Sequence, residues 1–94
     1  MRDYEFMTAF TTDEEQYKKG SDAVRELLKQ VNAEIINEET YGDREMCYEI
    51  KKQRRGRYVL FLIKCEPDKI LELDRQLKLN QSLLTYLFIR SDNK

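Results

Sequence analysis

Histidine is absent from the 94-residue chain, and cysteine, glycine and proline are rare, with 2, 3 and 1 residues. Histidine is the commonest acid–base side chain near neutral pH and the usual partner of cysteine at zinc sites. The two cysteines, Cys47 and Cys65, are too far apart in sequence for metal-ligand spacing, and the glycines form no phosphate-binding pattern. These absences argue against an enzyme and predict neither a cofactor nor a metal.

Long apolar runs are missing as well. No stretch approaches the roughly 18 apolar residues that cross a membrane, and the first residues alternate in polarity instead of forming a signal-peptide core. We therefore expect a cytoplasmic protein without a membrane partner. Its length suits one domain over residues 1–94, and its hydrophobic share of 40% argues against disorder.

The charge is unevenly distributed, although the net charge is only −1. Residues 1–40 hold 5 Lys/Arg and 10 Asp/Glu, whereas residues 41–57 hold 6 and 3. Affinity for phosphate depends on local charge and not on the average. Residues 41–57 are therefore the place where a nucleic acid would bind.

Hydrophobic periodicity predicts the order of the elements. Residues 4–10 alternate as in a half-buried strand, and a helix over residues 13–32 follows, with Thr12 as its cap and Glu15 completing a capping box. A second strand begins near residue 33 and leads into a hairpin, whose other strand covers residues 58–63. A helix from Pro67 to about residue 80, a strand over residues 83–90 and a short frayed tail complete the chain.

This βαββαβ order predicts an α+β fold, the ferredoxin-like sandwich. Its four-stranded antiparallel sheet carries two helices on one face. Right-handed crossovers place the first and third strands in the centre and the other two at the edges.

The hairpin is predicted to turn at residues 53–56, with Gly56 at a positive φ, so that Lys52 faces Arg57. Its tip and flanks are strongly basic: Arg44, Lys51, Lys52, Arg54, Arg55 and Arg57. Such a tip can follow a phosphate backbone, with Tyr48 or Tyr58 stacking on a base. The alternative is a solvated hairpin end that protects an edge strand from aggregation.

The predicted register also assigns two faces to the hairpin. The core side is expected to hold Met46, Tyr48, Ile50, Val59, Phe61 and Ile63. Tyr58, Leu60 and Leu62 then form an apolar strip in a charged frame on the other face, and we predict that they bind a partner. The alternative is that Leu60 and Leu62 are only half exposed beneath long neighbours.

Two other features have a chemical and a structural interpretation. Asp13, Glu14 and Glu15 could hold a cation, but we favour an acidic first helical turn. Cys47 could be a reactive thiol, but we favour an inert strand residue. Because the register places Cys47 and Cys65 on opposite faces, we expect both to be free thiols in a reducing compartment.

Two protein classes with this topology are weaker candidates. The RNA-recognition motif has a third-strand signature that residues 55–61 match only in fragments. A stand-alone regulatory domain that dimerises through the exposed sheet face and binds a small molecule is the alternative from a different class.

Residues 42–51, Gly-Asp-Arg-Glu-Met-Cys-Tyr-Glu-Ile-Lys, resemble a known family signature. The signature is Gly-x-Arg/Lys-x-Leu-Ala/Ser-Tyr-x-Ile-Lys, of the bacterial small-subunit ribosomal protein number six family. Supporting matches are Met1-Arg2-x-Tyr4-Glu5, Gly56-x-Tyr58 and a last strand that ends in Arg90. The resemblance covers essentially the whole chain and implies the same βαββαβ fold.

The resemblance implies a structural protein that binds the central domain of small-subunit ribosomal RNA together with a small basic protein, ribosomal protein number eighteen. It implies no catalysis and no small-molecule substrate. Within the signature it assigns Tyr48 and Ile50 to packing and Gly42 to a bend in the strand. Combined with the basic tip, it gives these RNA-binding candidates: Arg2, Tyr4, Arg44, Lys51, Lys52, Arg54, Arg55, Arg57 and Arg90.

One departure from the family pattern bears on RNA binding. Many members have an arginine at the start of the last strand, where this chain has Thr85. We hypothesise that Arg54 and Arg55 compensate for it. Because residues 1–40 are acidic, we also expect weak binding to RNA alone and stronger binding beside the basic partner.

Overall fold

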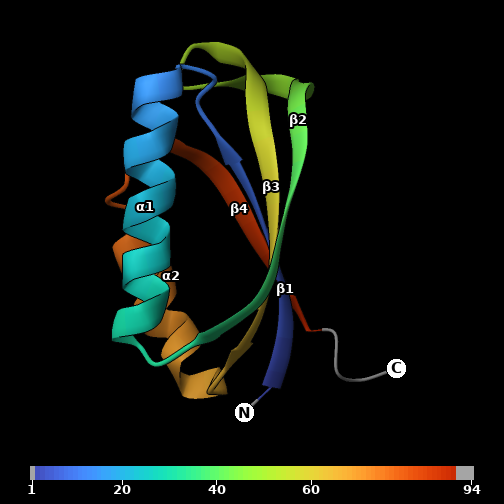
Figure 1. Ribbon diagram of the computed structural model, residues 1–94. Coiled ribbons are helices and arrows are strands. Elements are labelled where there is room, and N and C mark those ends of the chain that lie inside the picture. Colours follow the sequence, from blue (N-terminus) through green and yellow to red (C-terminus); the bar gives the residue numbers. More distant parts are fainter. Residues whose placement is uncertain (1, 91–94) are drawn as a thin grey trace.

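The computed structural model describes residues 2–90, which have the predicted βαββαβ order (Figure 1). The strands are β1 (Arg2–Phe10), β2 (Glu34–Ile50), β3 (Gln53–Cys65) and β4 (Leu83–Arg90). The helices are α1 (Glu14–Gln30) and α2 (Ile70–Leu77), and a 3-10 turn at Pro67–Lys69 leads into α2. The tail predicted for residues 91–94 lies outside the described residues.

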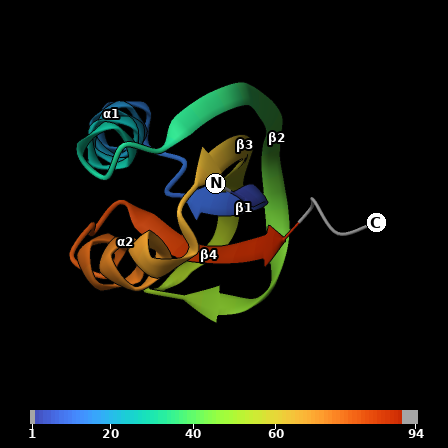
Figure 2. The same cartoon turned by 90° about the horizontal axis from the view of Figure 1, so that it is seen from below.

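The four strands form one antiparallel sheet in the order β2-β3-β1-β4. The first and third strands are therefore central, as predicted from the handedness of the crossovers. Figure 2 shows both helices on one side of the sheet, with the other side uncovered by any helix. This second side is called the open face below.

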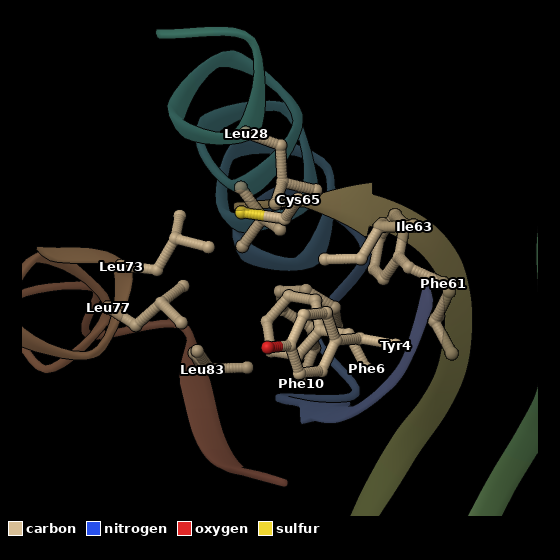
Figure 3. Packing of buried hydrophobic residues seen from close by; sticks show 12 residues of the cluster. Tyr4, Phe6, Phe10, Leu28, Phe61, Ile63, Cys65, Leu73, Leu77 and Leu83 are labelled. Carbon is tan, nitrogen blue, oxygen red and sulfur yellow. The ribbon is translucent and has the colours of Figure 1, made fainter. Parts of the chain in front are cut away.

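The core lies between the helices and the sheet (Figure 3). Period-two alternation along β1 directs Tyr4, Phe6, Thr8 and Phe10 toward the helices, and all four are buried. Helical spacing brings Val24 and Leu28 of α1, and Leu73 and Leu77 of α2, onto them. Phe6 stacks on Phe88 of β4, with ring centroids 4.4 Å apart. The side chains of β1 and β3 that alternate with these buried ones therefore lie on the open face.

Helix α1 begins one residue later than predicted. Its N-cap is Asp13 and not Thr12, because a carboxylate oxygen of Asp13 accepts hydrogen bonds from the backbone N–H groups of Glu15 and Gln16. Aspartate caps a helix at least as well as threonine, so Asp13 and not the neighbouring Thr12 forms the cap. The acidic first turn holds Glu14 and Glu15, as the helix dipole favours.

The predicted hairpin turn at residues 53–56 is wrong. Ile50 pairs with Gln53, so the turn is Lys51–Lys52, and both lysines have positive φ angles of 51° and 65°. Positive φ at both central residues is the requirement of a tight two-residue hairpin turn, usually met by Asn-Gly. Neither lysine carries that signal. The pairing is correspondingly displaced, and Gly56 faces Arg44 inside the ladder.

Gly56 is needed for space and not for a turn. A Cβ atom there would lie 3.3 Å from both the Ala9 Cβ and the Met46 Sδ atoms. The glycine with a positive φ is Gly42, at 84°, where the β2–β3 register shifts between Thr40 and Gly42. A glycine at such a bulge lets the long strand β2 bend, as the family resemblance implied.

The predicted division of faces is correct for β3 and partly wrong for β2. Val59, Phe61 and Ile63 are buried toward the helices, and Met46 is buried too. Tyr48, however, is 73% exposed, which corrects its assignment to the core. The physical reason is a second irregularity: residues 46–49 lie opposite Arg54 alone, so polarity alternation no longer maps onto two faces.

Candidate RNA-binding and partner-binding surfaces

The predicted RNA-binding residues fall into two groups at opposite ends of the sheet. Arg2 and Arg90 lie at one end, where Arg90 pairs with Tyr4. The other end carries the β2–β3 hairpin, where Arg57 pairs with Phe10, the last residue of β1. Arg2 and Phe10 are eight residues apart in one strand, about 26 Å at the usual rise. The structure therefore does not bring all the candidates into one patch.

The hairpin end forms what we call the basic arm, residues 44–57. It crosses the end of the open face toward β4 (Figure 2). Met46, Tyr48 and Ile50 of the arm accordingly line one hollow together with Thr85 of β4. At the tip of the arm, the ammonium group of Lys51 donates a hydrogen bond to the backbone oxygen of Leu83 at 3.1 Å, which holds the tip against the start of β4. The arm thus lies beside Thr85, the position where the family resemblance leads one to expect an arginine.

Within the basic arm, the candidates differ in how their charge is used. The side chains of Lys52 and Arg54 are exposed and form no hydrogen bond or ion pair with any other residue in the range 2–90. Arg44 and Arg55 each donate to a backbone oxygen, of Tyr41 at 3.2 Å and of Asp43 at 3.3 Å, and both remain exposed. These four side chains can still approach a phosphate.

Arg57 is different, because its guanidinium group is already engaged inside the protein. It forms ion pairs with Asp43 and Glu14, both at 2.8 Å, and lies over the ring of Tyr17 at 4.6 Å. Its side chain is only 14% exposed. The hydrogen bond to Asp43 is the main cause that raises the pKa of Arg57, and the same bond lowers the pKa of Asp43. Arg57 therefore ties the basic arm to the start of α1, and its predicted RNA contact stays a prediction.

Tyr48 and Arg54 lie together on the basic arm and line a hollow with Cys47 and Glu49. Tyr48 projects from the irregular segment opposite Arg54. An exposed aromatic ring beside a free guanidinium group suits an unpaired base and its phosphate. Cys47 is exposed here, whereas Cys65 is buried, and burial is the main cause that raises the pKa of the Cys65 thiol. Both cysteines are free, as predicted.

The predicted partner-binding residues lie side by side on the open face. Tyr58, Leu60 and Leu62 alternate along β3 away from the core, and each is half-buried. Two exposed residues of β4, which sequence reasoning missed, continue this surface: Leu87 is 58% exposed and Ile89 is 48% exposed. Strand β4 is apolar on both sides, so its sequence carries no alternation that would have indicated them.

Tyr41 is a second residue that the sequence did not indicate. It lies at the bulge beside Gly42 and lines a hollow with Arg44 and Tyr58 on the open face. Its hydroxyl group donates to a carboxylate oxygen of Glu39 at 3.2 Å. The charge of Glu39 is the main cause that raises the pKa of Tyr41, and Glu5 adds to it. The apolar strip is thus bordered by carboxylates.

Comparison with known proteins identifies the family. The family model described as "Ribosomal protein S6" matches residues 3–90. The "Small ribosomal subunit protein bS6" of Treponema pallidum (strain Nichols) is 50% identical over 93 residues, which are 99% of this chain and 100% of that protein. The chain belongs to the ribosomal protein S6 family.

Two further relatives agree with this assignment. The bS6 protein of Treponema denticola is 48% identical and covers 99% of this chain and 100% of its own length. The crystal structure of the 30S ribosomal protein S6 from Thermotoga maritima has the same fold, with a TM-score of 0.85 and 24% identity. The structural match spans 96% of this chain and 87% of the Thermotoga chain.

Membership of the S6 family makes this chain a structural protein of the small ribosomal subunit, located on the ribosome in the cytoplasm and not an enzyme. The ribosomal role predicted from residues 42–51 is therefore confirmed at this level. Among residues 2–90, neither helix is long and apolar enough to cross a membrane.

Proposed function

We propose that this S6-family protein binds the central domain of small-subunit ribosomal RNA as one half of a pair with a basic protein. That protein, small-subunit ribosomal protein number eighteen, is called the basic partner below. The observation that carries the proposal is the division of the surface. A basic arm with free cations lies next to an apolar open face bordered by carboxylates.

The RNA-binding part of the proposal rests on the basic arm. Lys52 and Arg54 have charges that no described residue neutralises, and Arg44 and Arg55 stand beside them. Phosphate contacts need such accessible cations, while an unpaired base can stack on the exposed ring of Tyr48. Arg57 acts indirectly, since its ion pairs hold the arm in place. Arg2 and Arg90 form a second contact at the far end of the sheet, whereas Tyr4, which was predicted to contact RNA, is buried in the core between the sheet and the helices.

The partner-binding part rests on the open face. Tyr58, Leu60 and Leu62 form an apolar strip that Leu87 and Ile89 extend across the sheet. An apolar surface of this kind marks a protein contact, and its acidic border favours a partner of positive charge. The basic partner would also neutralise part of the excess negative charge of residues 1–40, which otherwise repels RNA.

The alternative of a regulatory domain that binds a small molecule has no support beyond topology. The C-terminal domain of the MgtC protein from Mycobacterium tuberculosis has a TM-score of 0.64 but only 8% identity, so the likeness concerns the fold alone. The S6-family membership argues for a ribosomal role instead.

The test is binding to a central-domain ribosomal RNA fragment with and without the basic partner, at two salt concentrations. We expect weak binding by the chain alone, and binding with the partner that is much tighter and weakens as salt rises. Leu60→Glu should abolish the gain that the partner provides. Tight binding without the partner, or no binding in either case, would contradict the proposal.

A further inference from the structure

We propose that Glu5, a carboxylate in the middle of the open face, selects the basic partner by pairing with a lysine or arginine that the partner places opposite it. The inference deepens the proposed function and rests on it. It adds a residue that determines which protein the open face accepts.

The position of Glu5 follows from the strand pairing. Glu5 lies on the central strand β1, directly between Leu62 of β3 and Ile89 of β4. The next residue of β1 on this face is Met7, which lies between Leu60 and Leu87. Glu5 therefore has apolar side chains on both flanking strands, and the next residue of its own strand on this face, Met7, has them too.

The charge of Glu5 is not neutralised within the protein. Its side chain is half-buried, and it forms no hydrogen bond or ion pair with any other residue of the described range. The charged groups that share this face include Asp3 before it on β1 and Glu39 on β2. Glu39 differs from Glu5, because its oxygens already accept hydrogen bonds from Asn37 and Tyr41.

Lys64 and Arg44 are the basic residues that the pairing places on the same face, but neither neutralises Glu5. Lys64 pairs in register with Asp3, and Arg44 pairs with Gly56 at the hairpin end. A protein that covers Leu62 and Ile89 must therefore cover an unpaired carboxylate. Burial of an unpaired charge costs far more than apolar contact returns, unless the other surface supplies a cation with good geometry.

The same argument explains why the open face should not bind a second copy of the chain. Two open faces brought together would bury two Glu5 carboxylates among apolar groups, together with Asp3 and Glu39 of both copies. Like charges placed opposite each other disfavour the wrong partner. Glu5 thus favours binding of a basic protein to the open face and disfavours self-association of the chain.

The experiment measures the affinity of the basic partner for Glu5→Gln, Glu5→Lys and Glu5→Leu chains by calorimetry. We expect Glu5→Gln to weaken binding by about tenfold to a hundredfold, because the partner's cation is left unpaired on burial. Glu5→Lys should abolish binding, and one Lys or Arg to Glu change in the partner should restore it. Glu5→Leu should lose partner affinity and gain a dimer in sedimentation measurements.

Two controls separate this inference from the proposed function. Glu26→Gln removes the same charge from an exposed site on α1 and should leave partner affinity unchanged. Thermal unfolding midpoints should show that every variant is folded. If the unaltered chain does not bind the basic partner, the proposed function fails. If it binds, and Glu5→Gln binds as tightly as Glu26→Gln, the function stands and the role of Glu5 is refuted.

Discussion

At the scale of single residues, Arg57 shows that a charged side chain in a basic segment can have a structural task. Its partners come from different elements, Asp43 from β2 and Glu14 and Tyr17 from α1. The sequence marked it only as one of six basic residues near the hairpin. The alternation that places Val59 on the helix side also places Arg57 there, but the sequence could not show which side chains of α1 and β2 would meet it.

We expect Arg57→Met to lower the free energy of unfolding by about 2 kcal/mol at neutral pH, because two carboxylates lose their charged hydrogen-bond partner. The free energy of unfolding of this variant should also fall less steeply as the pH is lowered. Asp43 has a lowered pKa in the folded protein, so its pairing stabilises the fold above the unfolded pKa of about 4. That stabilisation disappears as pH falls through the folded pKa. Urea unfolding between pH 2 and pH 7 measures both effects.

The matched control for this prediction is Arg54→Met on the same arm. Arg54 is exposed and has no partner among residues 2–90, so this change should alter stability by less than about 0.5 kcal/mol. Asp43→Asn should reproduce the loss of acid dependence. An Arg57→Met chain as stable as Arg54→Met, with an unchanged pH profile, would show that the ion pairs contribute nothing.

At the scale of elements, hydrophobic periodicity was sufficient to predict the strands, the helices and the order of the sheet. It failed where the backbone departs from regular pairing. Strand β2 contains three register shifts. Its hairpin turns at Lys51 and Lys52, whereas the turn was predicted at residues 53–56 because of Gly56. Bulges and positive φ angles at non-glycine residues arise from tertiary packing, so Tyr48 could not be assigned correctly from alternation.

Gly20 offers a test of packing between elements. We expect Gly20→Ala to destabilise the protein by about 2 kcal/mol, although alanine favours a helix over glycine by about 1 kcal/mol. A Cβ atom at this buried position would lie 2.5 Å from the Cβ of Ser82, just before β4. The amide of Asn80 also donates to the Gly20 backbone oxygen at 3.1 Å, which holds the two segments close.

Thermal and urea unfolding would measure this change, with Lys19→Ala as the control at the neighbouring exposed position. Lys19→Ala should leave stability almost unaltered, because no packed neighbour is disturbed. A more stable Gly20→Ala chain would mean that helix propensity outweighs the contact with Ser82, and that α1 can shift without cost.

At the scale of the whole molecule, the chain separates two kinds of surface that its average charge conceals. The sequence predicted the basic segment and the strip of Tyr58, Leu60 and Leu62, because both depend on local pattern. It did not predict that Leu87 and Ile89 extend the strip, since an apolar strand does not reveal which side it exposes. Nor could it show that the basic candidates lie at two ends of the sheet.

This separation makes a quantitative prediction for RNA binding in the presence of the basic partner. Each phosphate contact contributes about 0.7 to 0.9 to the slope of log affinity against log salt concentration. Arg54→Ala with Arg55→Ala should therefore reduce the slope by about 1.4 to 1.8, if these residues compensate for Thr85. Arg75→Ala, an exposed cation on α2, should leave the slope unchanged. An unaltered slope in the double variant would place the RNA away from the basic arm, at the end of the sheet that holds Arg2 and Arg90.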